Sequence, residues 1–432
     1  MKPKLLTTIV GYTAPQFVAD AIAGVTVGLV ALPLSIAIAI ASGAPPAAGL
    51  ITAVVAGFLI SALGGSRVQI GGPTGAFIVV VYDVITEHGY EGLLVCTLMA
   101  GTILLVAGLL RAGRLIRHIP EAVIDGFTIG IAIVIATSQL KDLAGLATGP
   151  LSADFLHKVE GLWAARETLD LAAVVLGVGT IGAILVLRRV APRIPGMVLA
   201  IAFASAAAAF ALPSVETVGE RYGSLPEGLP WPSFPSFVLA DLAGLLPSAI
   251  TIALLAGIES LLSAIVADRM IGGAHRSSAE LLAQGAANLA SPLFGGLPAT
   301  GAIARTATNV RAGGRTPVAG IIHALAILVA MIFASSAAEA LALPALAGLL
   351  IVTAWSMTEP HRWRDRLALP RSEMALMTLT IALTVLADLT VAIGVGTGIG
   401  LALRLSAQKT PPPNWQTPER GQGSMDIDKR PT

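Results

Sequence analysis

Apolar residues occur along this chain in long runs that are hydrophobic on every side, rather than in stripes. The first example is the stretch from Ala21 to Ser66, which contains no charged side chain. A helix needs about 20 apolar residues to cross a bilayer, so this stretch alone is long enough for two crossings. The strands of a membrane barrel would alternate apolar and polar residues, and these runs do not. The pattern predicts an all-α polytopic membrane protein.

The runs divide into fourteen predicted membrane-spanning segments, several of them short. They are 18–41, 46–63, 68–86, 92–110, 119–138, 170–188, 195–213, 243–267, 280–296, 298–311, 316–334, 339–357, 372–388 and 389–406. The composition agrees, because 55% of the residues are hydrophobic and 12% are charged, whereas about a quarter of the residues in soluble domains are charged. The segments use most of the chain, so the sequence leaves no room for a large extramembrane domain.

The distribution of cations predicts the orientation, because cytoplasmic loops carry the excess of Lys and Arg. If the N-terminus is cytoplasmic, only four of the chain's 27 Lys and Arg residues fall on the external side: Lys141, Lys158, Arg166 and Arg221. An error of one segment would mix the two sets, so the count of fourteen has support beyond hydropathy. Both termini are therefore predicted to be cytoplasmic, with the protein in the cytoplasmic (inner) membrane. The net charge of +1 argues against a nucleic-acid partner.

Segments outside the membrane are expected to be modest. Residues 1–408 are predicted to form the transmembrane domain, with long external loops at Lys141–Asp170 and Ser214–Asp241. Residues 409–432 are Pro-rich and polar with almost no apolar content, so this tail is predicted to be disordered and cytoplasmic.

Two of the predicted segments are broken by Gly and Pro. The third reads VQIGGPTGAFIVVV from Val68, and the tenth reads FGGLPATGAIARTATNV from Phe294; both contain Thr-Gly-Ala, at 74–76 and 300–302. With seven segments per half, an odd number, the second half must be inverted in the membrane. We therefore predict inverted repeats over about 15–213 and 240–406. Interrupted helices in corresponding positions of such repeats indicate a substrate site near the midplane.

The chemistry of such a site follows from the backbone. A half-helix that begins inside the membrane presents free N–H groups and the positive end of its dipole, which together favour an anion. The two predicted starts are Thr74–Phe77 and Thr300–Ile303, where Gly75 and Gly301 would let a ligand approach the backbone closely. The alternative interpretation is that these Gly and Pro residues serve only helix packing or kinks.

Ionisable residues at membrane depth are costly, and Glu259 is the clearest case. It lies past the middle of the eighth segment, with the small residues Ala256 and Ser263 on the same helical face. Glu259 is a candidate proton carrier, whereas a nearby Na⁺ would keep it ionised. A structural carboxylate that is hydrogen-bonded to a neighbouring helix is the alternative.

Arg305, one turn into the tenth segment, could attract an anion or neutralise Glu259, or it could extend to the cytoplasmic surface. Four aspartates near segment ends are predicted to be solvated or capping groups: Asp20, Asp83, Asp125 and Asp388. The six histidines fall almost all in loops and none has metal-ligand spacing, so no metal site is predicted. No phosphate-binding loop or catalytic motif is present, which argues against an ATP-driven pump or an enzyme. No cofactor is expected beyond a coupling ion, H⁺ or Na⁺.

Four stretches resemble the SulP (sulfate permease) family of anion transporters, relatives of the animal sulfate transporters and prestin. They are Ala23–Ala53, Gly71–Val81, Ile119–Ile133 and Glu280–Ile321, the last of them long and specific. The resemblance implies a seven-plus-seven inverted-repeat fold, shared with nucleobase transporters, in which a core domain moves against a gate domain. It implies substrates among sulfate, bicarbonate, other small inorganic anions and dicarboxylates. It also leads us to expect a homodimer in the lipid bilayer.

The resemblance also implies roles for individual residues. It places the anion between the half-helices that begin near Thr74–Phe77 and Ala302–Ala304, with Ser35 nearby. It places the coupling cation at Glu259 and Ser263, and Arg305 resembles a frequent basic residue of the tenth helix. The predicted substrate-binding residues are Ser35, Thr74, Gly75, Ala76, Phe77, Thr300, Gly301, Ala302, Ile303 and Ala304. Sodium-coupled bicarbonate members typically have Asp at the coupling position, so Glu259 favours protons. Most members continue into a cytoplasmic STAS domain, which is not expected here because the sequence ends in the polar tail.

The sequence therefore predicts secondary active transport of a small inorganic anion, coupled to H⁺ and working by an elevator-like movement. Three alternatives stay open. A passive anion channel or an exchanger would keep the half-helix site without needing the carboxylate. A nucleobase–cation symporter on the same fold would usually carry a second acid on the tenth helix, where this chain has Ala302, Ala304 and Arg305. A membrane enzyme is the most distant alternative.

Overall fold

The computed structural model describes residues 2–114, 120–149, 151–191, 194–236 and 242–387, together with 391–392, 394–396 and 398–400. These residues form helices almost throughout, as the hydrophobic pattern predicts. The predicted tail (409–432) and Asp388 lie outside the described residues, as does most of the last predicted segment (389–406).

One group of helices combines the first part of each half of the chain. Its closest pairings are α4 with α11 and α12, and α14 with α2 and α3, so helices from the two halves interleave. We call this group the core. It consists of α2 (Ala14–Ala41), α3 (Pro46–Leu63), α4 (Ile78–Leu109), α11 (Leu242–Ile271), α12 (Ser277–Ala290), α13 (Ile303–Arg311) and α14 (Pro317–Phe333).

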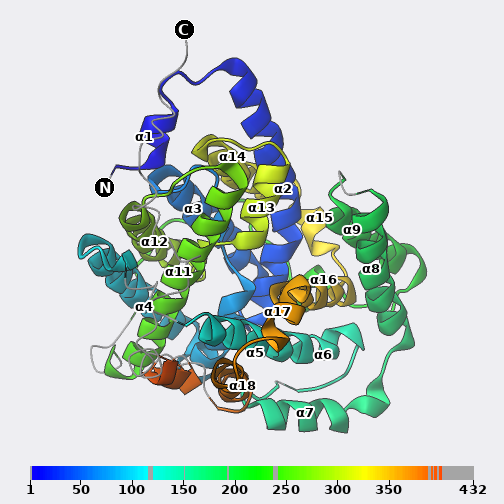
Figure 1. The fold of residues 1–432 in the computed structure, drawn as a ribbon. Coiled ribbons are helices and arrows are strands. Elements are labelled where there is room, and N and C mark those ends of the chain that lie inside the picture. The colour runs from blue at the N-terminus through cyan, green and yellow to red at the C-terminus, as the bar shows by residue number, and fades with distance from the viewer. Residues whose placement is uncertain are drawn as a thin grey trace.

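A second group, which we call the gate, packs beside the core. Within it α5 packs against α16 and α18, and α8 packs against α9 and α16. Figure 1 shows α8 and α9 on one flank of the molecule and α4 and α12 on the opposite flank. Contacts between the groups run mainly through α2, which meets α9 and α16, and between α4 and α5. The gate consists of α5 (Glu121–Ser138), α8 (Leu171–Val190), α9 (Gly196–Ala211), α16 (Leu343–Met357) and α18 (Arg371–Leu386).

Short elements connect these helices. Two strands of two residues each pair with one another, and the other connectors are brief helices and 3₁₀ turns. They are α1 (Lys4–Thr8), β1 (Gly71–Gly72), η1 (Gly75–Phe77), η2 (Ala112–Arg114), α6 (Leu140–Leu143), α7 (Phe155–Ala164), η4 (Arg166–Thr168), α10 (Val218–Tyr222), η6 (Ser291–Phe294), β2 (Thr300–Gly301), α15 (Ser335–Glu339), η7 (Pro360–Arg362) and α17 (Trp363–Leu367).

The predicted third and fourth segments form one helix, α4, which differs from the prediction of two. It has 32 residues, so at about 1.5 Å per residue it is longer than the hydrocarbon core is thick. The helix is interrupted at Gly89, whose φ of 71° is outside the helical range. Six described helices are long and apolar enough to cross a membrane, while α9 and α14 are apolar but shorter.

Asp20 confirms the predicted capping role, although it caps a helix from the other half of the chain. Its carboxylate is fully buried and accepts hydrogen bonds from the backbone N–H groups of Arg315 (2.7 Å) and Thr316 (3.2 Å) and from the Thr316 hydroxyl (2.5 Å). These groups stand at the start of α14, where backbone N–H groups lack helical partners. Asp20 therefore fastens α2 to α14 within the core.

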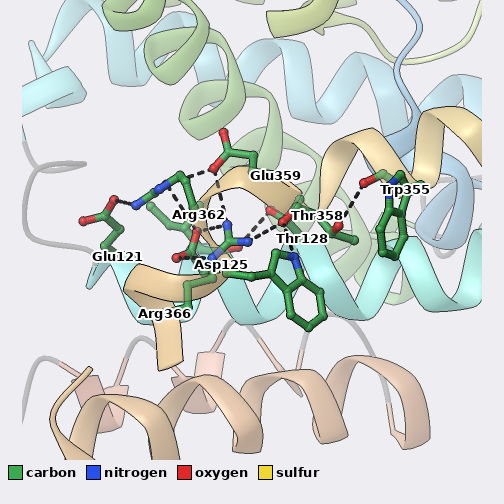
Figure 2. A network of polar contacts seen from close by, with 10 residues as sticks. Glu121, Asp125, Thr128, Trp355, Thr358, Glu359, Arg362 and Arg366 are labelled. Carbon is green, nitrogen blue, oxygen red and sulfur yellow. Dashed lines mark hydrogen bonds and ion pairs between the residues drawn. The ribbon is translucent and has the colours of Figure 1, made fainter. Parts of the chain in front are cut away.

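The prediction for Asp125 is wrong, because this residue is neither solvated nor a cap. It is 7% exposed and accepts hydrogen bonds from Arg366 Nε (3.0 Å) and Nη2 (2.9 Å), which joins α5 to α17. Figure 2 shows the surrounding network, in which Arg362 contacts Glu121 and Glu359. A buried carboxylate needs such a partner, and the partner lies 241 residues away, where the hydrophobic pattern gives no signal.

Candidate functional site

The two broken segments meet at the centre of the core through a short antiparallel pairing. Gly71 of β1 pairs with Gly301 of β2, and Gly72 pairs with Thr300. Each strand leads directly into a helix, β1 into η1 and α4, and β2 into α13. The chain therefore brings two helix N-termini together from segments that lie half its length apart, as the inverted-repeat interpretation predicts.

The first helix start is built around Thr74. Its hydroxyl oxygen accepts the backbone N–H of Ala76 (3.0 Å), which caps η1, and the hydroxyl donates to the Glu259 carboxylate (3.0 Å and 3.1 Å to its two oxygens). Gly75 lies against the gate, since a Cβ placed there would be 3.2 Å from Met357 Sδ. In this structure Gly75, Ala76 and Phe77 are all buried, so Gly75 serves close packing between the core and the gate.

The second helix start lies where the family resemblance places it, near Ala302–Ala304, and not at Thr300, the first residue of the start read from the Gly and Pro pattern. The helix begins at Ile303, with Ala302 as its extended N-cap, whereas Thr300 and Gly301 lie in β2. The Thr300 hydroxyl donates to the carbonyl of Ala256 (2.8 Å) instead of facing a ligand. Residues Ile303 and Ala304 are half-buried and exposed, respectively, and their N–H groups belong to the first helical turn, which has no internal acceptors.

The shared Thr-Gly-Ala motif is therefore not in register between the repeats. Thr74 is the N-cap of the first helix start, and its counterpart in the second is Ala302. Gly301 sits where only a hydrogen fits, because a Cβ there would be 1.5 Å from Gln69 Nε2. Glycine and threonine recur in the two segments for different local reasons, and the tripeptide match reflects composition as much as symmetry.

Arg305 is buried and does not extend to the surface. It is 3% exposed, and its Nη2 donates to the carbonyl of Pro73 (2.5 Å), immediately before the first helix start. Gly72, with a φ of 148°, leaves room for the guanidinium, because a Cβ there would be 2.4 Å from Arg305 Nη1. Within the part of the chain that the structure describes, the Nε and Nη1 donors have no hydrogen-bond partner. Buried donors of a cation are costly when unpaired, so this guanidinium is suited to meeting an anion.

Glu259 and Ser263 occupy the same face of α11 but have different surroundings. Glu259 is half-buried and interacts electrostatically with Arg305. Ser263 is fully buried and donates to the Thr306 hydroxyl (3.1 Å), which in turn accepts the N–H of Ile70 (3.1 Å). Ser263 therefore fastens α11 to α13 and to the strand before the first helix start. Ser35, in α2, is also fully buried, and no described residue forms a hydrogen bond with its hydroxyl.

Glu280, a fully buried acid on α12, was not singled out from the sequence. One of its carboxylate oxygens accepts the N–H groups of Gly65 (2.9 Å) and Ser66 (3.1 Å), and the other accepts from Ser260 (3.0 Å) and Gln284 (2.9 Å). Glu280 thus connects α12 to α11 and to the loop that leads into β1. A signal was available in the sequence, because Glu280, Gln284 and Asn288 recur every four residues and form a polar stripe on an otherwise apolar helix.

Two histidines lie within long helices rather than in loops, His88 in α4 and His323 in α14. His323 is fully buried, and neither of its ring nitrogens has a hydrogen-bond partner among the described residues. A single histidine within an apolar predicted segment forms no pattern, so the sequence did not indicate a role for His323.

Comparison with known proteins decides the family. The sequence profile described as "Sulfate permease family" matches residues 17–380. The chain belongs to the sulfate permease family. The chain is similar to the transporter YvdB of Bacillus subtilis (strain 168), with 42% identity over 382 residues, covering 88% of this chain and 72% of YvdB. The bicarbonate transporter BicA of Picosynechococcus is 31% identical over 388 residues, covering 86% of this chain and 67% of BicA.

Solved structures of related transporters have the same fold as this chain. The transmembrane domain of a cyanobacterial bicarbonate transporter BicA superposes with a TM-score of 0.79 at 29% identity, covering 89% of this chain and 99% of that domain. The murine anion transporter Slc26a9 in its inward-facing state has a TM-score of 0.84 at 15% identity, covering 94% of this chain and 72% of that one. The fold is the seven-plus-seven inverted repeat. The chain is therefore a membrane-embedded anion transporter and not an enzyme.

Proposed function

We propose that this protein carries out secondary active transport of a small inorganic anion, in symport with H⁺ and by an elevator-like movement. The proposed substrates are of the sulfate or bicarbonate class, with dicarboxylates as a further possibility. Relatives named for bicarbonate and for sulfate transport support this class: BicA, and the chloroplastic sulfate transporter 4.1 of Arabidopsis thaliana, which is 30% identical over 397 residues.

The observation that carries the proposal is the junction of the two helix starts beside Arg305. The N-terminus of a helix attracts an anion through its free N–H groups and dipole. Two such termini and the unpaired donors of a buried guanidinium meet around β1 and β2. This arrangement recognises negative charge and size rather than one chemical species, which agrees with a family that handles several anions.

Glu259 supplies a physical reason for coupling to a proton. Its carboxylate is hydrogen-bonded to Thr74, the residue that caps the first helix start. An ionised Glu259 would compete with the substrate for the same positive helix end and would repel a second anion. Protonation removes that charge and frees the helix end, so the anion and the proton are expected to bind together. Sodium is the alternative coupling ion. It would leave Glu259 ionised but would balance its negative charge.

The division into core and gate supports the elevator proposal. The residues of the proposed site come from the core, in α2, α11, α13 and the β1–η1 segment. The gate meets this site with the ends of α5 and α16, where Ile135 and Met357 lie against Gly75. Because the described contacts between the two groups run mainly through α2 and between α4 and α5, the core could slide past the gate as a unit.

An uptake panel tests the substrate class. The protein is reconstituted into liposomes, and uptake of labelled sulfate, bicarbonate and fumarate is measured under imposed proton and sodium gradients. The proposal expects at least one of these anions to accumulate against its gradient when the proton gradient is directed inward. If no anion accumulates under either gradient, the proposal of secondary active transport fails.

The alternatives give different outcomes. A passive channel would carry anion currents that survive Glu259→Gln unchanged, and an exchanger would need an anion on the opposite side rather than a proton gradient. A nucleobase symporter would bind uracil in calorimetry. The tenth segment disfavours that alternative, since it carries Ala302, Ala304 and Arg305 rather than a second acid.

We also propose that the protein is a homodimer in the cytoplasmic membrane, with both termini in the cytoplasm. The cation distribution supports the orientation, and the resemblance to the family supports the dimer. A single cysteine placed near either terminus should react with a membrane-impermeant reagent only after cells are opened. Mass measurement in detergent should give twice the 43.9 kDa of one chain.

A further inference from the structure

Three of the four cations predicted to face outward converge on one cavity. Lys141, Lys158 and Arg221 come from α6, α7 and α10, and all three line a cavity of about 160 Å³. Its other walls are the end of α2, the first turns of α4 and the end of α5. α2 and α5 reach the cavity at their C-terminal ends, and α6, α7 and α10 lie on the predicted external side, so the cation distribution predicts that the cavity faces outward.

The cavity reaches inward to the proposed transport site. Ile78 and Val79, which line it, follow directly after Phe77, the last residue of η1. Core elements form one wall and gate elements form the other, so the cavity lies in the seam that an elevator movement would open. The cavity therefore lies on the predicted external side of the junction of the two helix starts.

The charges that face the cavity are not equivalent. Arg221 already has two anionic partners, because it donates hydrogen bonds to Asp142 (2.5 Å) and Glu216 (2.5 Å). Lys141 makes only long contacts from Nζ to the carbonyls of Thr148 and Gly149, both 3.5 Å. Its ammonium has three donors, so it retains capacity for a further partner.

Lys158 is unusual for a lysine in an external loop, because it is 5% exposed. Its Nζ lies 5.4 Å from the centre of the Tyr82 ring, and the Tyr82 hydroxyl donates to the carbonyl of Leu151 (2.5 Å). Burial lowers the pKa of Lys158, although Asp83 and Asp154 act in the opposite direction. The nearby carboxylates therefore do not fully compensate for the loss of water around this ammonium, and an additional anion would stabilise it.

We propose that this cavity is a second anion-binding site, at which Lys158 and Lys141 hold a small oxyanion before it passes to the helix junction. Its volume suits a small tetrahedral or planar oxyanion with a few waters. Asp83, which also lines the cavity and has a partner of its own, keeps the net charge low, so the site releases the anion readily. The proposal rests on the proposed transport of anions from the external side.

Kinetics of uptake by intact cells test the site, because only the external face is then available. The variants are Lys158→Gln, Lys141→Gln and the pair together. Arg166→Gln is the matched control, since Arg166 carries the same charge on the same side but stacks on Trp163 (4.9 Å) outside the cavity. Each single variant should raise the KM for external anion about fivefold, and the pair about tenfold or more, with little change in kcat. Lys158→Arg should restore most of the affinity.

A second measurement detects binding without transport. Cys96 is the chain's one cysteine and is buried, so Lys158→Cys in a Cys96→Ala background offers a single reactive position. A membrane-impermeant thiol reagent should label it from outside, and external sulfate should slow the labelling. A positively charged reagent should restore a low KM, whereas a negatively charged reagent should not.

The outcomes separate the two proposals. A wild-type protein that takes up no anion would refute the proposed transport, while sulfate protection of position 158 would still support the cavity site. Uptake by the wild type with an unchanged KM in the paired lysine variant would overturn the cavity site alone. Labelling of position 158 that ignores sulfate, or that occurs only from the cytoplasmic side, would overturn it as well.

Discussion

The ion pair between Asp125 and Arg366 allows a stability prediction with a worked magnitude. Asp125→Asn keeps the shape of the side chain and removes its charge, which leaves the Arg366 guanidinium 5% exposed without its bidentate partner. Breaking a buried pair in this way costs about 3–5 kcal/mol. Arg366 keeps a contact with Glu359 at 3.3 Å, but the side chain of Glu359 is 37% exposed and therefore screened. We expect the free energy of unfolding to fall by about 3 kcal/mol, at the lower end of that range.

The same network supplies matched controls. Glu121 pairs with Arg362, and their side chains are 49% and 34% exposed, so Glu121→Gln should cost less than about 1 kcal/mol. Replacing both partners, as Asp125→Asn with Arg366→Met, removes the unpaired charge. The double variant should therefore be more stable than Asp125→Asn alone.

Denaturant titration of the purified protein in detergent measures these differences, with tryptophan fluorescence as the signal because Trp355 and Trp363 stack beside the network (6.5 Å between ring centres). The midpoint should drop for Asp125→Asn, hardly move for Glu121→Gln, and recover in the double variant. If Asp125→Asn and Glu121→Gln lower the free energy of unfolding by the same amount, burial does not determine how much each ion pair contributes, and the prediction is refuted.

Two further variants test the helix junction by uptake of labelled anion per amount of protein in the membrane. Thr74→Ala removes both the hydrogen bond to Glu259 and the cap of η1, so transport should fall at least tenfold, whereas Thr74→Ser should retain most of it; equal activity in both would contradict the role of the hydroxyl. Gly301→Ala places a Cβ 1.5 Å from Gln69 Nε2 and should abolish uptake by separating β1 from β2, while Gly179→Ala, with nothing within 4 Å, should be neutral. An active Gly301→Ala variant would show that the strand pairing tolerates displacement.

The sequence was sufficient for the architecture because the bilayer imposes simple rules. Helices must satisfy their own backbone, so apolar runs predict them, and cations predict which ends face the cytoplasm. The same rules identified the two broken segments, since Gly71–Gly72 and Pro298 interrupt runs that would otherwise continue as helix. Such local patterns can be recognised in the sequence without knowing the tertiary contacts.

Details of the site could not be predicted, because they depend on contacts between distant segments. The second helix begins at Ile303 rather than Thr300, since Thr300 and Gly301 are recruited into a strand whose partner lies in the first repeat. Asp125 is buried because it pairs with Arg366, which lies in the other half of the chain. In both contacts the partners lie far apart along the sequence, so no local pattern predicts that they pair.

Glu259 is proposed to couple a proton to anion movement through the helix junction, and reconstitution with controlled gradients tests this coupling. Wild type and Glu259→Gln are reconstituted side by side, and accumulation of the preferred anion is followed under an inward proton gradient, an inward sodium gradient, and no gradient. The wild type should accumulate anion only with the proton gradient, and Glu259→Gln should merely equilibrate it. Accumulation driven by sodium, or Glu259→Gln that concentrates anion as well as the wild type does, would contradict proton coupling through Glu259.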